Sequence, residues 1–273
     1  MSDSQPTGWI PDREDRNRLI AFCVQSQRHA QAFRSVEVPE NLTHDWLRIE
    51  HQNRIGSCQG HDLTTGGEVL HYLATGEQVQ LSRLHAYIGT QSIDQKNGVP
   101  GVYVGADAGS TIAGGLEYGL KGFALESNCP YRGDHYPNQA ECLQILSVKQ
   151  DARFAIKSGF EVEDYQHGLQ CVAGGMVLTI GTIWDFIIDP DWIARQWSPR
   201  GRGGHARAIC EIRNRRLCEI NSWGRDWGLQ GRFCWEEAAF NAMLKHPWTV
   251  CLALTRDMKP KPRKIDFTKL WSP

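Results

Sequence analysis

The spacing of apolar and polar positions predicts helices in the first half of the chain. Helices are predicted from Cys58 to Tyr72, from Leu81 to Ile88 and from Ile112 to Lys121. The pair Gly66-Gly67 lies inside the first of these helices, although each glycine costs a helix about 1 kcal/mol relative to Ala. The glycine pair therefore indicates close packing against another element. Gly122 follows the third helix and is expected to end it.

The second half of the chain carries the patterns of β-strands. Met176 to Phe186 alternates and is rich in Val, Ile and Thr, which is typical of a strand. His205 to Ile212 and Leu217 to Asn221 flank a polar turn and predict a β-hairpin. Residues 189–204 contain two prolines and the run Arg-Gly-Arg-Gly-Gly, so we expect a long loop there. Shorter strands are expected at Phe233 to Trp235 and at Val250 to Leu254.

The remaining segments complete the outline of an α+β fold. A partial apolar face allows a helix between Asp12 and Phe33, whereas 36–51 looks extended and 94–110 is rich in glycine and loop-like. Helices thus precede strands along the chain. This segregation is typical of α+β proteins, in which helices gather on one side of a largely antiparallel sheet.

Composition and charge exclude several classes of protein. The chain has 273 residues, 41% of them hydrophobic and 22% charged, as expected for an ordinary folded domain or two lobes sharing a core. Its formal net charge of −1 argues against a nucleic-acid partner, which usually meets a basic surface. No run of about 18 apolar residues predicts a membrane span.

The cysteines point to a reducing compartment. The sequence holds nine of them, an odd number, so at least one must lie outside any intrachain disulfide. No Cys-x-x-Cys pair occurs, which removes the strongest zinc and redox signatures. The polar N-terminus lacks the layout of a secretory signal. We therefore expect a cytoplasmic protein with mostly reduced cysteines.

A cysteine at a predicted helix start is the first candidate for chemistry. Cys58 would lie against the positive end of the helix dipole, which favours thiolate over thiol. Gly56 and Ser57 allow a tight entry into that helix, and Gln52 carries an amide that can donate to a developing oxyanion. This segment predicts a nucleophile with an oxyanion donor beside it.

A histidine and an asparagine on the predicted hairpin supply the complementary groups. His205 can exchange a proton near neutral pH. Asn221 lies 16 residues further on (221 − 205), across the hairpin, and its carboxamide can accept the other ring N–H without adding a full charge. Trp223 can cover that hydrogen bond and exclude water from it.

The order of these motifs resembles that of the papain-like cysteine peptidases. The motifs are Gln-x5-Cys, Gly-His-Ala and Asn-Ser-Trp-Gly-x2-Trp-Gly. His205 follows Cys58 by 147 residues (205 − 58) and Asn221 by 163, close to the spacing of about 130–150 known for the family. The resemblance implies Cys58 as nucleophile, His205 as base, Asn221 as the orienting residue and Gln52 as oxyanion donor, with Trp223 in support.

The resemblance also implies an architecture. It covers 36–255 and predicts two lobes with a cleft between them, a helical lobe at about 52–145 and an antiparallel, barrel-like β lobe at about 150–255 plus 36–51. Residues 1–35 would form an N-terminal extension and 256–273 a C-terminal tail.

The implied partner is a polypeptide substrate. No nucleic acid, membrane, cofactor or metal is expected. The resemblance places the substrate backbone along a set of small or polar residues: Gly56, Ser57, Gln59, Gly109, Ser110 and Gly204.

Several positions depart from the family pattern. Gln59 replaces the usual Trp after the nucleophile, and Arg207 stands where a small apolar residue is preferred. Ile55 and Asp107 occupy both positions of the family's first disulfide, which fits a reducing compartment. The extension of about 35 residues is shorter than the inhibitory pro-segments of secretory members, and Gly8-Trp9-Ile10-Pro11-Asp12 looks like the short leader of some bacterial members. The resemblance thus implies a bacterial or phage-type enzyme.

Two other functions fit the same motifs. Gln59 and Arg207 allow a catalytically inactive relative that binds peptides or acts in assembly. A thiol enzyme that transfers its acyl group to an amine instead of water, a transamidase or ligase, would need the same side chains.

Overall fold

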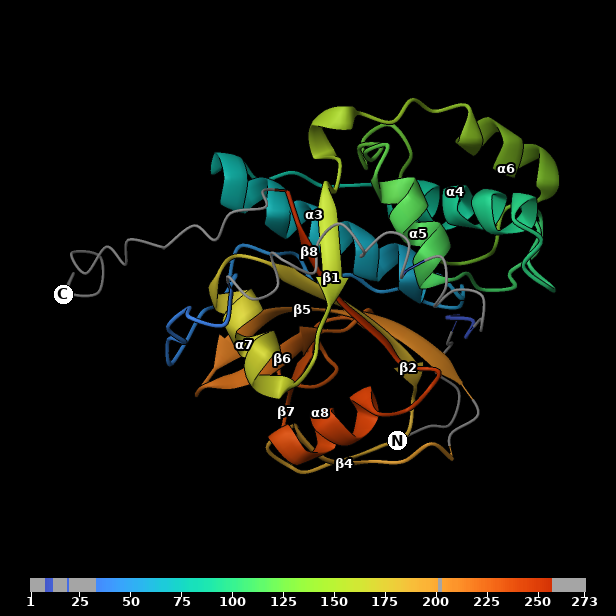
Figure 1. Ribbon diagram of the computed structural model, residues 1–273. Coiled ribbons are helices and arrows are strands. Elements are labelled where there is room, and N and C mark those ends of the chain that lie inside the picture. Colours follow the sequence, from blue (N-terminus) through green and yellow to red (C-terminus); the bar gives the residue numbers. More distant parts are fainter. Residues whose placement is uncertain (1–7, 12–18, 20–32, 201–202, 257–273) are drawn as a thin grey trace.

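A computed structural model shows two lobes, one built from helices and the other from a β-sheet (Figure 1). It describes residues 8–11, 19, 33–200 and 203–256. The helical lobe contains α3 (Cys58–Thr75), α4 (Arg83–Lys96), α5 (Ile112–Gly119) and α6 (Gln139–Leu146). The 3-10 turn η1 (Ala152–Phe154) leads out of it, and α7 (Tyr165–Ala173) and α8 (Glu237–Leu244) accompany the sheet.

The sheet has eight strands and is open. The strands are β1 (Ser158–Glu161), β2 (Val177–Ile183), β3 (Phe186–Ile188), β4 (Ile193–Trp197), β5 (Gly204–Arg213), β6 (Arg216–Ile220), β7 (Arg232–Trp235) and β8 (Val250–Thr255). Their order is β1-β8-β2-β5-β6-β7-β4-β3, with β5 and β2 at the centre. All pairs are antiparallel except β4 with β7.

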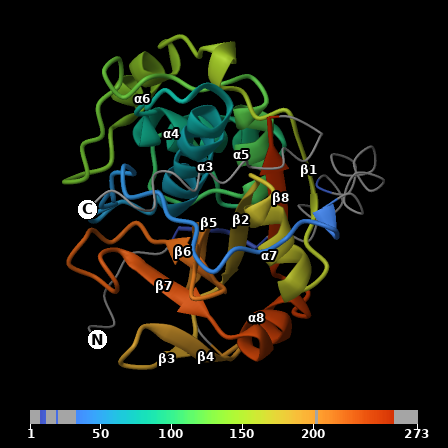
Figure 2. The same ribbon diagram turned by 90° about the vertical axis from the view of Figure 1, so that its left-hand side faces the viewer.

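The two-lobe α+β fold is therefore confirmed, but the barrel-like description of the β lobe is wrong. β1 and β3 are the two edges and do not pair with each other, so the sheet does not close. Figure 2 shows the helical lobe on one side of this sheet, and α7 and α8 lying against its strands, away from that lobe.

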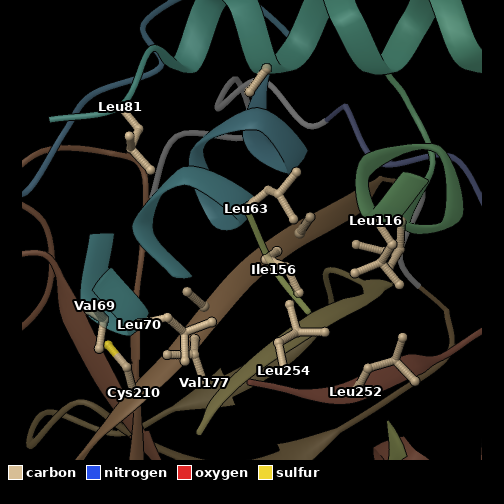
Figure 3. Close-up of a cluster of buried hydrophobic side chains, with 14 of the residues drawn as sticks. Leu63, Val69, Leu70, Leu81, Leu116, Ile156, Val177, Cys210, Leu252 and Leu254 are labelled. Atoms are coloured by element: carbon tan, nitrogen blue, oxygen red, sulfur yellow. The ribbon is translucent and has the colours of Figure 1, made fainter. Parts of the chain in front are cut away.

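Helix α3 joins the two lobes by packing lengthwise on the sheet. Figure 3 shows Leu63, Val69 and Leu70 of this helix facing side chains of the strands, among them Val177 and Leu254. These residues are buried and belong to one hydrophobic cluster. At about 25 cal/mol per Å² of apolar surface removed from water, such burial is the main force that holds the lobes together.

The glycine pair inside α3 explains how closely the helix is packed. A Cβ atom at Gly67 would lie 2.9 Å from Leu81 Cδ1 and 3.2 Å from Phe123 Cε2. A Cβ atom at Gly66 would already touch Val177 Cγ1 at 3.4 Å. The predicted close contact is confirmed, because the neighbouring side chains fill the space that a larger residue would need.

The hairpin of β5 and β6 positions two of the predicted site residues. Its turn residues, Asn214 and Arg215, have φ values of 48° and 58°. Two successive left-handed residues match the right-handed twist of adjoining strands, and Asn tolerates this conformation. The register pairs Ala208 with Ile220, and this brings His205 near the beginning of β5 alongside Asn221 just after β6.

The other predicted elements are confirmed in part. The predicted helices appear as α3, α4 and α5, the predicted strands as β2, β7 and β8, and the hairpin as β5 and β6. The long loop predicted over 189–204 is wrong, since β4 lies within it and pairs with β3 and β7. The helix predicted between Asp12 and Phe33 lies almost wholly outside the described residues. No helix in the described ranges is long and apolar enough to cross a membrane.

One disulfide joins two neighbouring strands. Cys218 of β6 and Cys234 of β7 face each other in the sheet register and are bonded. The other cysteines of the described residues are free and buried: Cys58, Cys129, Cys142, Cys171, Cys210 and Cys251.

Candidate active site

The candidate nucleophile is the first residue of α3. Its preceding residue, Ser57, does not cap the helix with its side chain. Instead the Ser57 hydroxyl contacts the Tyr131 hydroxyl at 2.7 Å, inside the helical lobe. Gln59 is also buried, and its Oε1 accepts a hydrogen bond from the Ser110 hydroxyl at 3.3 Å. The sulfur of Cys58 points to the β lobe, where the Ala206 N–H donates to it at 3.5 Å.

A single hydrogen bond fixes the tautomer of His205. Its Nε2 lies 2.8 Å from Oδ1 of Asn221. A carboxamide oxygen only accepts, so Nε2 carries the proton. In a neutral ring Nδ1 is then proton-free, and within the described structure it has no hydrogen-bond partner. Nδ1 is therefore the atom that can take a proton.

Two tryptophan rings enclose the imidazole. Trp223 stacks on His205 with ring centroids 4.8 Å apart and an interplanar angle of 20°. Trp184 meets His205 edge-on, at 5.2 Å and 90°, and also contacts Trp223 at 4.7 Å. These contacts hold the ring plane in place. Trp184 is not among the predicted site residues, because it follows the buried strand β2 directly and its sequence context indicates only a strand.

Gln52 is held where the loop before α3 meets the segment after β6. Its Nε2 donates to the Ile55 carbonyl at 2.9 Å, and its Oε1 accepts from the Ser222 hydroxyl at 2.6 Å. Its backbone N–H also donates to the Ser222 carbonyl at 2.8 Å. Because Ser222 follows Asn221 directly, Gln52 is tied to the same corner of the site.

Residues near the N-terminus lie across the site. The Ser110 N–H donates to the Gly8 carbonyl at 2.8 Å, and the Ile10 N–H donates to the Ser110 carbonyl at 3.0 Å. On the other side, the Trp9 N–H donates to the Gly204 carbonyl at 3.2 Å. We call residues 8–10 the leader segment. It bridges a loop of the helical lobe and the first residue of β5 in the β lobe.

The leader segment fits closely against glycines of both lobes. A Cβ atom at Gly8 would lie 1.7 Å from the Gly56 carbonyl oxygen, so only glycine fits there. The Trp9 side chain is 3% exposed and occupies a space next to Gly181 and Gly204. Cβ atoms at those two glycines would lie 2.5 Å from Trp9 Nε1 and 2.7 Å from Trp9 Cε3. We call this space the Trp9 pocket.

The burial of the site keeps its two titratable groups neutral. Burial raises the pKa of Cys58 to about 11, against the smaller opposing effect of the Ala206 and Gly8 N–H groups. Burial and the positive charge of Arg207 lower the pKa of His205 to about 3. At neutral pH Cys58 is therefore a thiol and His205 a neutral imidazole in this structure. The thiolate expected from the helix dipole alone is wrong for this covered state, because desolvation outweighs the dipole.

Arg207, which departs from the family pattern, lies in a buried ion pair. Its Nε donates to Glu219, whose other carboxylate oxygen accepts from the Trp235 indole N–H. Nearby on α3, Asp62 accepts from the Thr179 hydroxyl. Within the part of the chain that the structure describes, no three His, Cys, Asp or Glu residues are grouped to hold a metal ion.

Known structures share this fold. The chain is similar to xylellain, a cysteine protease from Xylella fastidiosa, with a TM-score of 0.65 and 19% identity over 93% of this chain and 97% of that one. The fold is that of the papain-like cysteine proteases.

Two plant cysteine proteases of known structure also have a similar fold. The cysteine protease CMS1MS2 from Carica candamarcensis, in complex with E-64, matches with a TM-score of 0.57 and 18% identity, over 81% of this chain and all of that one (100%). Bromelain from Ananas comosus, also with E64, matches with a TM-score of 0.57 and 16% identity over the same shares, 81% and 100%. No protein-family model and no curated protein matches the chain.

Proposed function

We propose that this protein is a papain-like cysteine peptidase that hydrolyses peptide bonds. One observation carries the proposal. The His205 Nε2–H is held by Asn221, and the next residue on the same strand, Ala206, donates its N–H to the sulfur of Cys58 at the start of α3. The fold of known cysteine proteases supports it. A bacterial or phage-type, cytoplasmic enzyme remains our prediction from the sequence.

The proposed reaction uses Cys58 as nucleophile, His205 as base and Gln52 as oxyanion donor. Nδ1 of His205 takes the thiol proton, and the Cys58 thiolate attacks the substrate carbonyl carbon. The Gln52 amide and the Cys58 backbone N–H donate to the resulting oxyanion. His205 then gives its proton to the leaving amine, and the acyl group stays on sulfur. Water, deprotonated by His205, releases the carboxylic acid and restores the thiol.

Substrate entry requires the leader segment to move. Cys58 is fully buried, and the Gly8 N–H of the leader segment lies against its sulfur. A substrate strand would use the backbone groups that the leader segment now occupies, those of Ser110 and Gly204, because these edge groups suit an added extended peptide. The structure is thus the covered form of the proposed enzyme.

The positions that raised the possibility of an inactive relative have structural roles. Gln59 is fixed by Ser110, and Arg207 is paired with Glu219, so neither replaces a reacting group. The transamidase alternative differs only in the second nucleophile. Products formed in the presence of an added amine distinguish it from hydrolysis.

Cys58→Ala tests the proposal. A mixture of unstructured peptides is incubated with the full chain, and fragments are identified by mass spectrometry. We expect cleavage by the parent protein and none by Cys58→Ala, whereas Cys142→Ala, another buried free cysteine, should cleave normally. E-64, the inhibitor bound in two similar structures, should add covalently to Cys58. Cleavage that survives in Cys58→Ala refutes the mechanism.

A further inference from the structure

A buried arginine lies next to the candidate base. Arg207 is two residues after His205 on β5, and successive side chains of a strand alternate, so both point to the same face of the sheet. Its side chain and that of its partner Glu219 have no exposed surface. Glu219 also accepts from Trp235, so the carboxylate that anchors Arg207 is itself anchored.

The guanidinium of Arg207 reaches the imidazole through one aromatic ring. Its Cζ lies 5.0 Å from the centre of the Trp184 ring and 5.1 Å from that of Phe186, within the range of cation–π contact. Trp184 in turn presses edge-on against His205. A chain of three contacts therefore runs from Glu219 to the ring that would take the proton.

The free end of Arg207 also borders the orienting residue. Its Nη1 and Nη2 have no hydrogen-bond partner among the described residues, and neither has Nδ2 of Asn221. Both side chains line one small cavity of about 10 Å³, together with Asp62 of α3.

The charged and titratable groups around His205 come from three elements. Helix α3 contributes Cys58, His61 and Asp62, β6 contributes Glu219, and β5 itself contributes Arg207. Burial raises the pKa of Asp62, which disfavours its charge, and lowers that of His61. Arg207 lowers the pKa of both His205 and Cys58.

We propose that Arg207 is a positioning residue for the reaction: its Glu219-anchored guanidinium holds Trp184 against the His205 ring and sets a positive charge beside the thiol–imidazole pair. The inference rests on the proposed function, since it concerns the same site. A positive charge favours the proton-free form of either group. Removing it therefore raises the pH at which each group loses its proton.

The test uses the full chain carrying Trp9→Ala, so that the site can be reached. In that background Arg207→Met/Glu219→Leu removes both partners, because loss of one alone would leave a buried unpaired charge. The matched control is Arg83→Met/Glu68→Leu, which removes a buried pair in the helical lobe. Near-ultraviolet circular dichroism verifies folding.

Two readouts are followed against pH: peptide cleavage and the rate of Cys58 alkylation by iodoacetamide. We expect both limbs of the profiles to move to higher pH by about one unit in Arg207→Met/Glu219→Leu, and not in the control. Arg207→Lys keeps the charge but not the planar guanidinium over Trp184. It should keep the pH profile while kcat falls about 10- to 100-fold with little change in KM.

Different outcomes refute the role of Arg207 and the proposed peptidase activity. An unchanged pH profile in Arg207→Met/Glu219→Leu, or an equal shift in the control, refutes the role of Arg207. If that variant does not fold, unchanged kcat in Arg207→Lys refutes it equally. Absence of peptide cleavage in every protein, with a shifted alkylation profile, refutes the peptidase and leaves the role of Arg207 in place.

Discussion

Trp9→Ala should uncover the thiol. The indole is buried in the Trp9 pocket against Gly181 and Gly204, and truncation of a buried Trp or Phe to Ala costs about 3–5 kcal/mol. Trp9 Nε1 is buried and has no hydrogen-bond partner among the described residues, which reduces what the indole contributes to stability. We therefore take the lower value, about 3 kcal/mol. That corresponds to a rise of roughly 100-fold in the population with the leader segment displaced.

The assay is the rate at which iodoacetamide alkylates Cys58 at pH 7.5, followed by peptide mapping. The covered thiol has no exposed surface, so reaction proceeds through the displaced form. The rate should rise about 100-fold in Trp9→Ala, or less once the displaced form dominates. Trp248→Ala is the control, because it truncates a tryptophan that is already 45% exposed.

An unchanged alkylation rate in a folded Trp9→Ala protein would show that the leader segment does not guard the thiol. An equal rise in Trp248→Ala would point to general loosening instead. A second route gives an independent check. Gly8→Val places a side chain against the Gly56 carbonyl, where even a Cβ atom would lie at 1.7 Å, and should also speed alkylation.

Four further outcomes follow from the geometry. Asn221→Ala should lower kcat about 100-fold or more in steady-state peptide cleavage, with little change in KM, because the imidazole loses the acceptor that fixes its tautomer. Gln52→Ala should lower kcat by about 10²–10³, measured in the same assay, by removing an oxyanion donor. In the covered parent chain the pKa of Cys58 is about 11, so its alkylation rate should rise tenfold per pH unit from pH 7 to 10, whereas Trp9→Ala should level off earlier as solvent reaches the sulfur. Glu219→Ala should reduce the free energy of unfolding in urea by about 3–5 kcal/mol, since it strands a buried guanidinium.

A specific result would contradict each of these four predictions. Unchanged kcat in Asn221→Ala or Gln52→Ala would remove that residue from the proposed machinery. Alkylation of the parent chain that levels off below pH 9 would mean that the thiol is not desolvated as the structure shows. A Glu219→Ala protein of unchanged stability would mean that the buried pair is open to water.

The sequence was sufficient to predict those elements that a short stretch of chain identifies by itself. Helix α3 was predicted in spite of the glycine pair inside it, and the β5–β6 hairpin because a polar turn separates two strand-like runs. The order of Cys58, His205 and Asn221 also led to the correct fold. Helix α6 was missed because it has only eight residues, fewer than the window over which helical periodicity can be recognised.

The features missed at the site arise from contacts between distant segments. The position of Trp9 depends on space left by Gly181 and Gly204, which no local pattern reveals. The raised pKa of Cys58 follows from its complete burial, which depends on segments far apart in the sequence. The partner of Arg207 is a glutamate on another strand, so the arginine appeared only as a departure from the family pattern.

The β5–β6 hairpin makes the proposed chemistry sensitive to a remote part of the chain. Asn214 and Arg215 form its turn, nine residues beyond His205 (214 − 205), and their left-handed conformations fix the alignment of the two strands. A slip of one residue between these strands would turn the carboxamide of Asn221 to the opposite face of the sheet. An insertion or deletion in that exposed turn that shifts this register would therefore disturb the proposed site without changing any reacting group.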